Sequence, residues 1–394
     1  MDSVKNTLPA EVAVHSSVQN EYDAVIVGGG LAGLALSIQL ANKGYKVILL
    51  EKELYPFHKV CGEYISLESW DFLTGLGLPL NTMNISHISK LQITLMNGKK
   101  LDQQLPLGGF GISRFVLDYA LAEIARSNGV IVEENTRATS IHFDSSSFSV
   151  KTPGKVYTAS VVCGSFGKRS NLDIRWKRPF ISKKKGKLNN YIGVKYHVRV
   201  DFPPDTIALH YFPNGYCGIV KIEENKYCLC YLTTAVNLAK CNGSIEIMEQ
   251  TILSQNPYLK KIFSESHKLY NQPLTISQIS FDRKTQVEEH VLLAGDAAGM
   301  ITPLCGNGMS MALHASKLAA EQIDLFIKGA ISREQMEKQY RHLWKINFSK
   351  RLKTGRIIQR MFDNKWLIHL LIYLGRKFPK LAVYLVRQTH GKSF

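Results

Sequence analysis

The sequence lacks the features that mark several classes of protein. No apolar run reaches the roughly twenty residues that a membrane-spanning helix needs, and residues 1–20 are polar, without the apolar core of a secretory signal. The seven cysteines are odd in number and have no paired C-x-x-C spacing, which disfavours a disulfide framework and a zinc site. We therefore expect a cytoplasmic chain with no bound metal, in which residues 1–20 form a flexible extension.

Acidic residues are scarce in two segments that carry most of the positive charge. The formal net charge is +17, and residues 341–394 hold thirteen Lys or Arg against one acid, while residues 168–187 hold nine against one. No recognition motif accompanies this charge, which argues against nucleic acid as a partner. In the C-terminal segment, basic residues flank apolar runs such as 366–374. The pattern suits a helical region on an anionic membrane surface, at its inner face, and equally one packed on the core with a solvated basic face.

A glycine-rich turn lies between two short apolar runs near the N-terminus. Residues 22–27 and 45–50 are typical of buried strands, and a helical pattern fills most of the space between the turn and the second run. The first glycine would make the tight turn, the third would let the backbone approach a pyrophosphate, and the last would let the helix pack on the strand. The helix start would then offer free N–H groups to the phosphates. The residues predicted to bind there are Gly28, Gly30, Leu31, Ala32 and Gly33.

An acid closes the second strand. Glu51 stands where a carboxylate accepts hydrogen bonds from a ribose diol, and Lys52 follows it. The order of strand, glycine turn, helix, strand and acid predicts a Rossmann-type dinucleotide site, but it does not separate FAD from NAD.

Three later segments favour FAD. Residues 291–299 form a strand and turn that contain Asp296 and lead into a glycine turn and a helical run. This stretch resembles the second FAD signature of para-hydroxybenzoate hydroxylase-like flavoproteins. The resemblance implies that Asp296 binds the ribitol chain and that the helix start faces the flavin pyrimidine edge, where its dipole would stabilise negative charge. The residues placed there by the resemblance are Gly306, Asn307, Gly308 and Met309.

The other two segments lie in the first half of the chain. Arg114 begins an amphipathic helix, where the same superfamily has an arginine that contacts the cofactor; a solvated helix-start arginine is the alternative. Residues 161–170 contain Gly164 and resemble the middle motif of the superfamily, but Phe166 replaces its usual Asp. This replacement argues against direct use of NAD(P)H. The electron donor stays open, with a separate reductase or a ferredoxin-type protein as the expected partner.

The segment after Glu51 suggests a branch of the superfamily. Residues 55–63, Tyr-Pro-Phe-His-Lys-Val-Cys-Gly-Glu, resemble the Pro…Lys-x-Cys-Gly segment of geranylgeranyl reductase-like flavoproteins, in which the cysteine lies near the reactive face of the flavin. They depart from it at Glu63, where those reductases have small residues. They are also similar to flavin-dependent halogenases, but the Trp-x-Trp-x-Ile-Pro element of those enzymes is absent. The resemblance adds Lys59, Cys61 and Gly62 to the cofactor site.

Cys61 and His58 are the catalytic candidates. His58 would donate a proton, because an imidazole titrates near neutral pH. The second signature would bring Cys305 to the flavin as well. Either cysteine is also explained as a small buried side chain, more readily so for Cys305, and His58 as a surface or capping residue.

The expected fold is mixed α/β (α+β). A discontinuous Rossmann-type FAD-binding domain (21–80, 108–185 and 275–330) is interleaved with a β-sheet substrate domain (81–107 and 186–274) and followed by basic C-terminal helices (331–394). The Asn97-Gly98 pair predicts a hairpin turn. Tyr211, Phe212 and Tyr216 would line an apolar pocket or would simply pack in the sheet.

The leading prediction is an FAD-dependent monooxygenase that acts through a flavin C4a-hydroperoxide on a hydrophobic, aromatic or polyketide-type small molecule. One alternative is a geranylgeranyl reductase-like enzyme that reduces isoprenoid double bonds, with Cys61 helping to protonate the product. A third, from another class, is a non-enzymatic flavoprotein on membranes.

Overall fold

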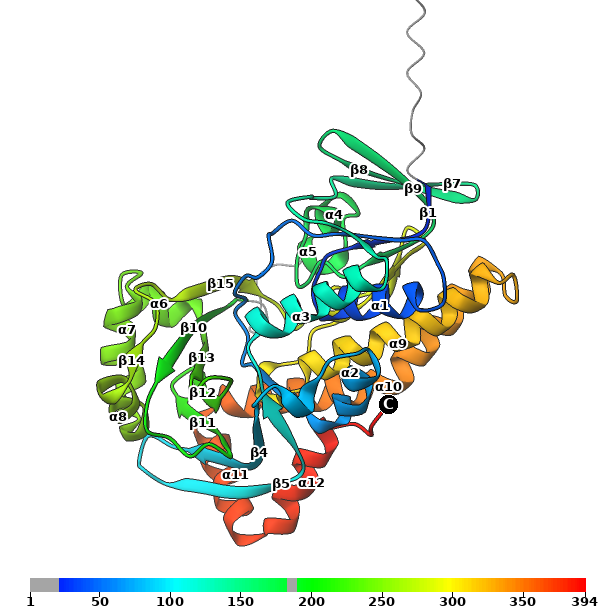
Figure 1. The fold of residues 1–394 in the computed structure, drawn as a ribbon. Coiled ribbons are helices and arrows are strands. Elements are labelled where there is room, and N and C mark those ends of the chain that lie inside the picture. The colour runs from blue at the N-terminus through cyan, green and yellow to red at the C-terminus, as the bar shows by residue number, and fades with distance from the viewer. Residues whose placement is uncertain (1–20, 183–189) are drawn as a thin grey trace, which may run out of the picture.

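Two β-sheets organise the computed structural model, which describes residues 21–182 and 190–394 (Figure 1). The predicted extension, residues 1–20, lies outside the described part of the chain, as do residues 183–189 of the basic segment 168–187. One sheet is largely parallel and the other largely antiparallel, and helices pack on both. The predicted mixed α/β class is confirmed.

The first sheet has a parallel centre. Its strands are β1 (Glu21–Val27), β2 (Val47–Leu50), β6 (Ile131–Glu133), β7 (Ser140–Asp144), β8 (Ser147–Thr152), β9 (Lys155–Gly164), β16 (Val287–Glu288) and β17 (Val291–Leu293). The order β17-β9-β1-β2-β6 is parallel throughout. Val27 pairs with both Leu50 and Gly164, so the carboxyl ends of β1, β2 and β9 meet at one edge. Ligands of open α/β sheets bind at that edge.

The second sheet is built mainly from the middle of the chain. Its strands are β3 (Tyr64–Ser66), β4 (Ser86–Thr94), β5 (Lys100–Gly111), β10 (Tyr191–Arg199), β11 (Thr206–Phe212), β12 (Gly215–Lys221), β13 (Tyr227–Thr234), β14 (His267–Lys268) and β15 (Leu274–Ile279). The turn that joins β4 to β5 contains Gly98 with φ +78°, as the hairpin signal predicts. β3 and the body of β15 come from segments assigned to the FAD-binding domain, so the structure differs there from the predicted division.

Twelve helices are described. They are α1 (Leu31–Ala41), α2 (Trp70–Gly75), α3 (Arg114–Ser127), α4 (Asn171–Arg175), α5 (Pro179–Ser182), α6 (Ala235–Lys240), α7 (Ile245–Thr251), α8 (Pro257–Glu265), α9 (Gly308–Ile327), α10 (Arg333–Phe362), α11 (Lys365–Lys377) and α12 (Pro379–Thr389). Helices α6, α7 and α8 cover the outer face of the second sheet, through residues such as Met248 and Leu259 (Figure 1). Helix α1 packs against α3 and α9, and α9 against α10.

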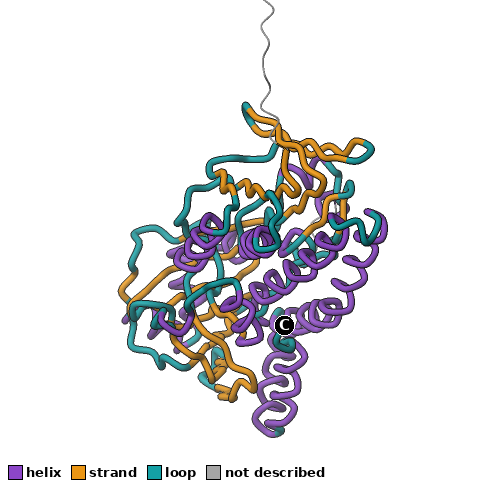
Figure 2. Tube along the Cα trace, turned by 45° about the vertical axis from the view of Figure 1, so that its right-hand side comes forward, coloured by secondary structure: helices purple, strands orange, loops and turns teal. Residues whose placement is uncertain are grey.

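The C-terminal helices divide into two parts. The long helix α10 begins with a capping box at Ser332. It buries Tyr340, Trp344 and Phe348 in the hydrophobic core that surrounds the first sheet and helix α9. Helices α11 and α12 form a hairpin at the lower end of the molecule in Figures 1 and 2. Within residues 21–182 and 190–394, no helix is both long and apolar enough to cross a bilayer.

Candidate active site

The glycine turn has the geometry that the sequence predicts. Gly28 has φ +107°, and a Cβ placed on it would lie 2.6 Å from the carbonyl oxygen of Ser165, which follows β9. A Cβ on Gly33 would collide with the carbonyl oxygen of Gly28, so α1 and β1 touch there through bare backbone. Helix α1 begins after Gly30 without a side-chain cap. The N–H groups of its first turn therefore face the mouth of the turn.

Two cations face the third glycine of the turn. A Cβ on Gly30 would lie 3.7 Å from Nη2 of Arg114 and 3.9 Å from Nζ of Lys59. Asp118 holds both: its oxygens lie 2.6 Å from Nε of Arg114 and 2.9 Å from Nζ of Lys59. Burial alone would raise the pKa of Asp118, but the two cations hold it below its usual value. Free backbone N–H groups, a bare glycine and two cations form a cradle that suits a pyrophosphate.

Glu51 and Tyr55 contact the glycine turn on the side where the ribose is expected. Oε2 of the buried Glu51 accepts a hydrogen bond from the N–H of Gly29 at 2.7 Å, which places the carboxylate beside the glycine turn. The Tyr55 hydroxyl donates to the carbonyl oxygen of Gly29. Lys52 instead pairs with Glu53 at 3.1 Å on the surface. The structure thus brings Glu51 to the turn, but among the described residues it gives the Lys52 side chain no contact there.

The second signature lies across the sheet edge from this turn. Burial raises the pKa of Asp296. The positive charges of Lys284, Arg114 and Lys168 oppose this rise. Lys284 donates to the carbonyl oxygen of Asp296 at 2.8 Å. Burial lowers the pKa of both Lys284 and Lys168 to about 8. The basic segment 168–187 therefore contributes a cation, Lys168, to this end of the site.

The glycine turn before α9 is crowded and partly unsatisfied. Gly306 has φ +64°, and a Cβ on it would lie 2.9 Å from the Tyr64 ring. Nδ2 of the buried Asn307 donates to the carbonyl oxygen of Thr389 at 2.5 Å, whereas its Oδ1 has no hydrogen-bond partner among the described residues. Gly308 begins α9 without a side-chain cap. The polar edge of a flavin ring could donate to the unpartnered Oδ1 of Asn307 and accept from the free N–H groups at the start of α9. The residues at this end of the site therefore also fit FAD.

Cys61 links the two signatures. Its Sγ lies 3.7 Å from Sδ of Met309, in the first turn of α9. Burial raises the pKa of the Cys61 thiol, so the thiol stays protonated at neutral pH. The structure therefore brings the Cys61 segment and the start of α9 together. The Cys305 side chain lies outside the described side chains.

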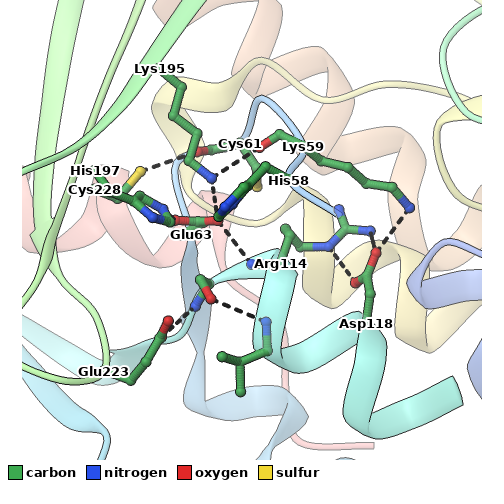
Figure 3. A network of polar contacts seen from close by, with 12 residues as sticks. His58, Lys59, Cys61, Glu63, Arg114, Asp118, Lys195, His197, Glu223 and Cys228 are labelled. Carbon is green, nitrogen blue, oxygen red and sulfur yellow. Dashed lines mark hydrogen bonds and ion pairs between the residues drawn. The ribbon is translucent and has the colours of Figure 1, made fainter. Parts of the chain in front are cut away.

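A buried charge cluster lies directly behind Cys61 (Figure 3). Glu63 is fully buried, pairs with Nζ of Lys195, and accepts from Nε2 of His197 at 2.6 Å and from the backbone N–H of Arg114 at 2.8 Å. Nζ of Lys195 also donates to the carbonyl oxygen of Lys59 at 3.0 Å. Burial alone would raise the pKa of Glu63, but Lys195 and His197 hold it below its ordinary value. Glu63 has φ +54°, a conformation that costs a non-glycine residue about 1–3 kcal/mol.

The cluster continues to the surface through two rings. The Tyr270 hydroxyl lies 2.5 Å from Nδ1 of His197 and 3.1 Å from Nε2 of His58, and His58 stacks on Phe115 at 4.5 Å. Burial, with Lys195 and His197, lowers the pKa of His58 to about 4. The expectation that His58 titrates near neutral pH is therefore wrong, because the ring is part-buried beside a cation. Neutral His58 can still pass a proton between its two nitrogens.

The same cluster contains a set of metal-ligand atoms. Those of Glu63, His197 and Cys228 lie within 4.8 Å of one another. Lys195 already neutralises Glu63, and burial raises the pKa of Cys228 well above its usual value, which keeps the thiol protonated. Since a metal-binding thiol must be deprotonated, this set is better suited to holding protons than to holding a cation.

Comparisons with known proteins agree with this geometry. The profile of the family described as FAD binding domain matches residues 21–170. Conditioned medium factor receptor 1 of Dictyostelium discoideum is 26% identical over 359 residues, 83% of this chain and 68% of that protein. Digeranylgeranylglycerophospholipid reductase of Methanococcus vannielii is 25% identical over 373 residues, 89% of this chain and 90% of that protein. Squalene monooxygenase of Mus musculus is 26% identical over 337 residues, 78% of this chain and 56% of that protein.

This chain is an FAD-dependent oxidoreductase, and it is similar to geranylgeranyl reductase-like and para-hydroxybenzoate hydroxylase-like flavoproteins. Two solved structures show the fold of this flavoenzyme. A flavin-dependent brominase matches with a TM-score of 0.76 at 19% identity, over 94% of this chain and 93% of that one. A geranylgeranyl bacteriochlorophyll reductase-like protein from Thermoplasma acidophilum matches with a TM-score of 0.72 at 19% identity, over 94% of this chain and 100% of that one.

The middle motif of the flavoenzyme is filled by an aromatic ring. A Cβ on Gly164 would lie 2.5 Å from the Phe166 ring, which is 6.2 Å from the Trp176 ring. Nearby, the buried Arg178 pairs with Asp173 at 2.6 Å and donates to the carbonyl oxygen of Ala297 at 3.0 Å. An aromatic ring therefore occupies the place where the superfamily has an aspartate. That this enzyme does not use NAD(P)H directly stays a prediction.

The aromatic residues of the second sheet lie on two faces. Tyr211 and Tyr216 pack against Phe362 of α10, at 6.5 and 6.1 Å between ring centroids. Phe212 packs against Tyr231 on the opposite face, under the helices α6 to α8. The grouping of all three around one pocket is wrong for Phe212, because successive side chains of a strand point to opposite faces.

The sequence patterns do not point to five residues of this candidate site. Two of them show a signal: Lys195 and His197 alternate with apolar residues in β10, so a lysine and a histidine share one face of a buried strand. Charged side chains in that position need partners. The departure from small residues at Glu63 was seen, but its partners were not. The missed residues are Glu63, Asp118, Lys195, His197 and Tyr270.

Proposed function

We propose that this flavoenzyme is a reductase that adds a hydride and a proton across a carbon–carbon double bond of an isoprenoid lipid. The relatives that support this substrate class are named for a digeranylgeranyl glycerophospholipid and for squalene, which are both isoprenoid lipids. The proposal reverses the order of the two enzyme alternatives drawn from the sequence. The non-enzymatic alternative is not favoured, because the relatives support an oxidoreductase.

One observation carries the choice of reduction: the thiol of Cys61 lies at the junction of the two FAD signatures, next to a hydrogen-bonded line that joins Glu63, His197, Tyr270 and His58. The residues would hold FAD as the geometry indicates, with the pyrophosphate near Gly30 and Arg114 and the ring edge near Asn307. When bound, FAD takes two electrons from a donor and supplies them to the substrate as hydride. A separate reductase or a ferredoxin-type protein is the proposed donor, since Phe166 replaces the usual aspartate.

The residues of this chain would supply the proton. Cys61 would protonate the substrate carbon next to the one that receives the hydride, because its raised pKa keeps hydrogen on Sγ at neutral pH. The backbone N–H of Glu63 and the charge of Arg114 face the resulting thiolate and would stabilise it until it is reprotonated. A hydrogen-bonded line runs from the part-exposed His58 through Tyr270 and His197 to the Glu63 carboxylate, two residues from Cys61. It would carry a proton from solvent to the neighbourhood of the thiolate, which takes it up when Cys61 is reprotonated.

A monooxygenase is the second candidate, favoured by the likeness to squalene monooxygenase. In that case the cluster behind Cys61 would serve to exclude water from the oxygen-transfer step.

The two candidates differ in their need for oxygen. FAD-loaded protein is reduced chemically under strict exclusion of oxygen and mixed with a polyprenyl glycerophospholipid dispersed in detergent. The reductase proposal predicts that the oxidised-flavin absorbance returns in step with loss of lipid double bonds. No reoxidation with any polyprenyl lipid until oxygen is admitted, followed by oxygenated product, would show the monooxygenase instead.

A further inference from the structure

We propose that the α11–α12 hairpin is a preformed docking surface for an anionic lipid bilayer. Four aromatic side chains stand out from it: Trp366 is 68% exposed, Tyr373 58%, Phe378 50% and Tyr384 56%. Among residues 21–182 and 190–394, the other large exposed aromatic is Tyr119. Trp and Tyr are the residues that soluble proteins have least reason to expose and that membrane interfaces favour.

The charge of the hairpin is complementary to anionic lipid. No Asp or Glu occurs after Asp363, and Lys365, Arg376, Lys377, Lys380 and Arg387 are all exposed. Where α11 meets α12, the exposed Phe378 is flanked by cations: Arg376 and Lys377 precede it and Lys380 follows. An apolar ring flanked by cations matches the boundary between acyl chains and phosphate headgroups.

The opposite side of the hairpin is fixed to the protein. Ile368, Ile372 and Ala382 are buried in the same cluster as Leu101 of β5. On α11 the buried Ile368, Ile372 and Gly375 lie about half a turn from Trp366 and Tyr373, so the two faces are opposed. The exposed aromatics are therefore held outward by packing.

Another surface helix shows that exposure of aromatics is not general. Helix α8 is also amphipathic and has cations on its outer face, including Lys260 and Lys261, but its buried face holds Leu259 and Ile262 and it exposes no large apolar side chain. A solvated basic face alone would resemble α8. The hairpin differs from it in the outward aromatic side chains, which favours lipid over water as the contact.

Vesicle binding of the full-length, FAD-loaded protein tests the proposal. We expect sedimentation with vesicles of phosphatidylcholine and phosphatidylserine, weaker binding in high salt, and little binding to phosphatidylcholine alone. The double variant Lys377→Gln, Lys380→Gln should lower the partition coefficient about thirtyfold, from the usual attraction of each lysine to an anionic surface. The matched control Lys260→Gln, Lys261→Gln on α8 should leave it unchanged.

A spectroscopic measurement locates the contact. Trp366 fluorescence should shift to the blue and lose access to iodide on vesicle binding, and Trp366→Phe should remove that shift while the protein still sediments. The proposal is overturned if the protein ignores anionic vesicles, if the α8 control loses binding as much as the hairpin variant, or if Trp366 stays open to iodide in the bound state.

Discussion

The two ends of the cofactor site are built in different ways. The phosphate end is organised by six consecutive residues, 28–33, whose backbone and missing side chains form the floor of the cradle, and Lys59 and Arg114 add its two cations. The end around Cys61 is made by groups from four separate segments: the Glu63 carboxylate after the cysteine, the backbone N–H of Arg114 at the start of α3, Lys195 and His197 in β10, and Tyr270 beyond β14. The first end depends on local chain geometry, and the second depends on the fold of both sheets.

The largest expected effect lies at the phosphate end. A Cβ on Gly30 meets no atom closer than 3.7 Å, so Gly30→Val should fold with nearly the thermal stability of FAD-free wild-type protein but purify without flavin colour, because its side chain would fill the phosphate position. Gly33→Val should instead lose stability as well, since its Cβ would collide with Gly28. Flavin absorbance and melting temperature measure the two effects. Stoichiometric FAD in Gly30→Val would mean that the cradle is misplaced.

At the Cys61 end of the site, the largest loss of stability should follow from removing one partner of the buried Lys195–Glu63 pair. Lys195→Met leaves the Glu63 carboxylate buried without its cation, and we expect a loss of about 3–5 kcal/mol in the free energy of unfolding. Denaturant titration measures it. The double variant Lys195→Met, Glu63→Gln should recover much of that loss, and Lys261→Met, from an exposed pair with Glu265, should cost less than about 0.5 kcal/mol. Equal losses in Lys195→Met and Lys261→Met would contradict a cluster that stabilises through buried charge.

Cys61 should affect rate and not cofactor binding. Cys61→Ser should lower the rate of lipid reduction about a hundredfold or more, because a hydroxyl is a poorer proton donor than a thiol, while FAD content stays the same. Wild-type activity should hold through mildly alkaline pH, since the pKa of the thiol is raised, and should fall only when the thiolate forms. Stopped-flow reoxidation across pH measures both. A serine variant with full rate would remove Cys61 from the proton path.

Acid should also destabilise the fold, through three histidines that lie outside the phosphate end. Burial lowers the pKa of His58 and His314 to about 4 and that of His210 to about 3, so the unfolded chain binds more protons below pH 6.5. The free energy of unfolding should therefore fall as pH decreases from 6.5 towards 4. Denaturant midpoints at several pH values follow it. In His58→Asn the slope should be shallower, and an unchanged slope would show that His58 is not buried as a neutral ring.

The same contrast explains what could be predicted from the sequence. Gly28, Gly30 and Gly33 have roles set within one turn of chain, so their spacing predicts them, and the hairpin at Gly98 is as local. Glu63 has no such local reason. Its buried carboxylate is tolerated only because Lys195 of β10, more than a hundred positions away in the sequence, pairs with it. Strand alternation places Tyr211 and Phe212 on opposite faces of β11, which is a local property, but the layer that each face meets, α10 or the helices α6 to α8, is set by the fold.

The mass of the lipid product separates reduction of a double bond by this flavoenzyme from its oxygenation. The protein is supplied with a chemical reductant, a polyprenyl glycerophospholipid and isotopically labelled dioxygen, and the lipid is recovered after turnover. The account predicts a product that has gained two hydrogen atoms per double bond and no label. A product that carries one labelled oxygen atom would contradict it.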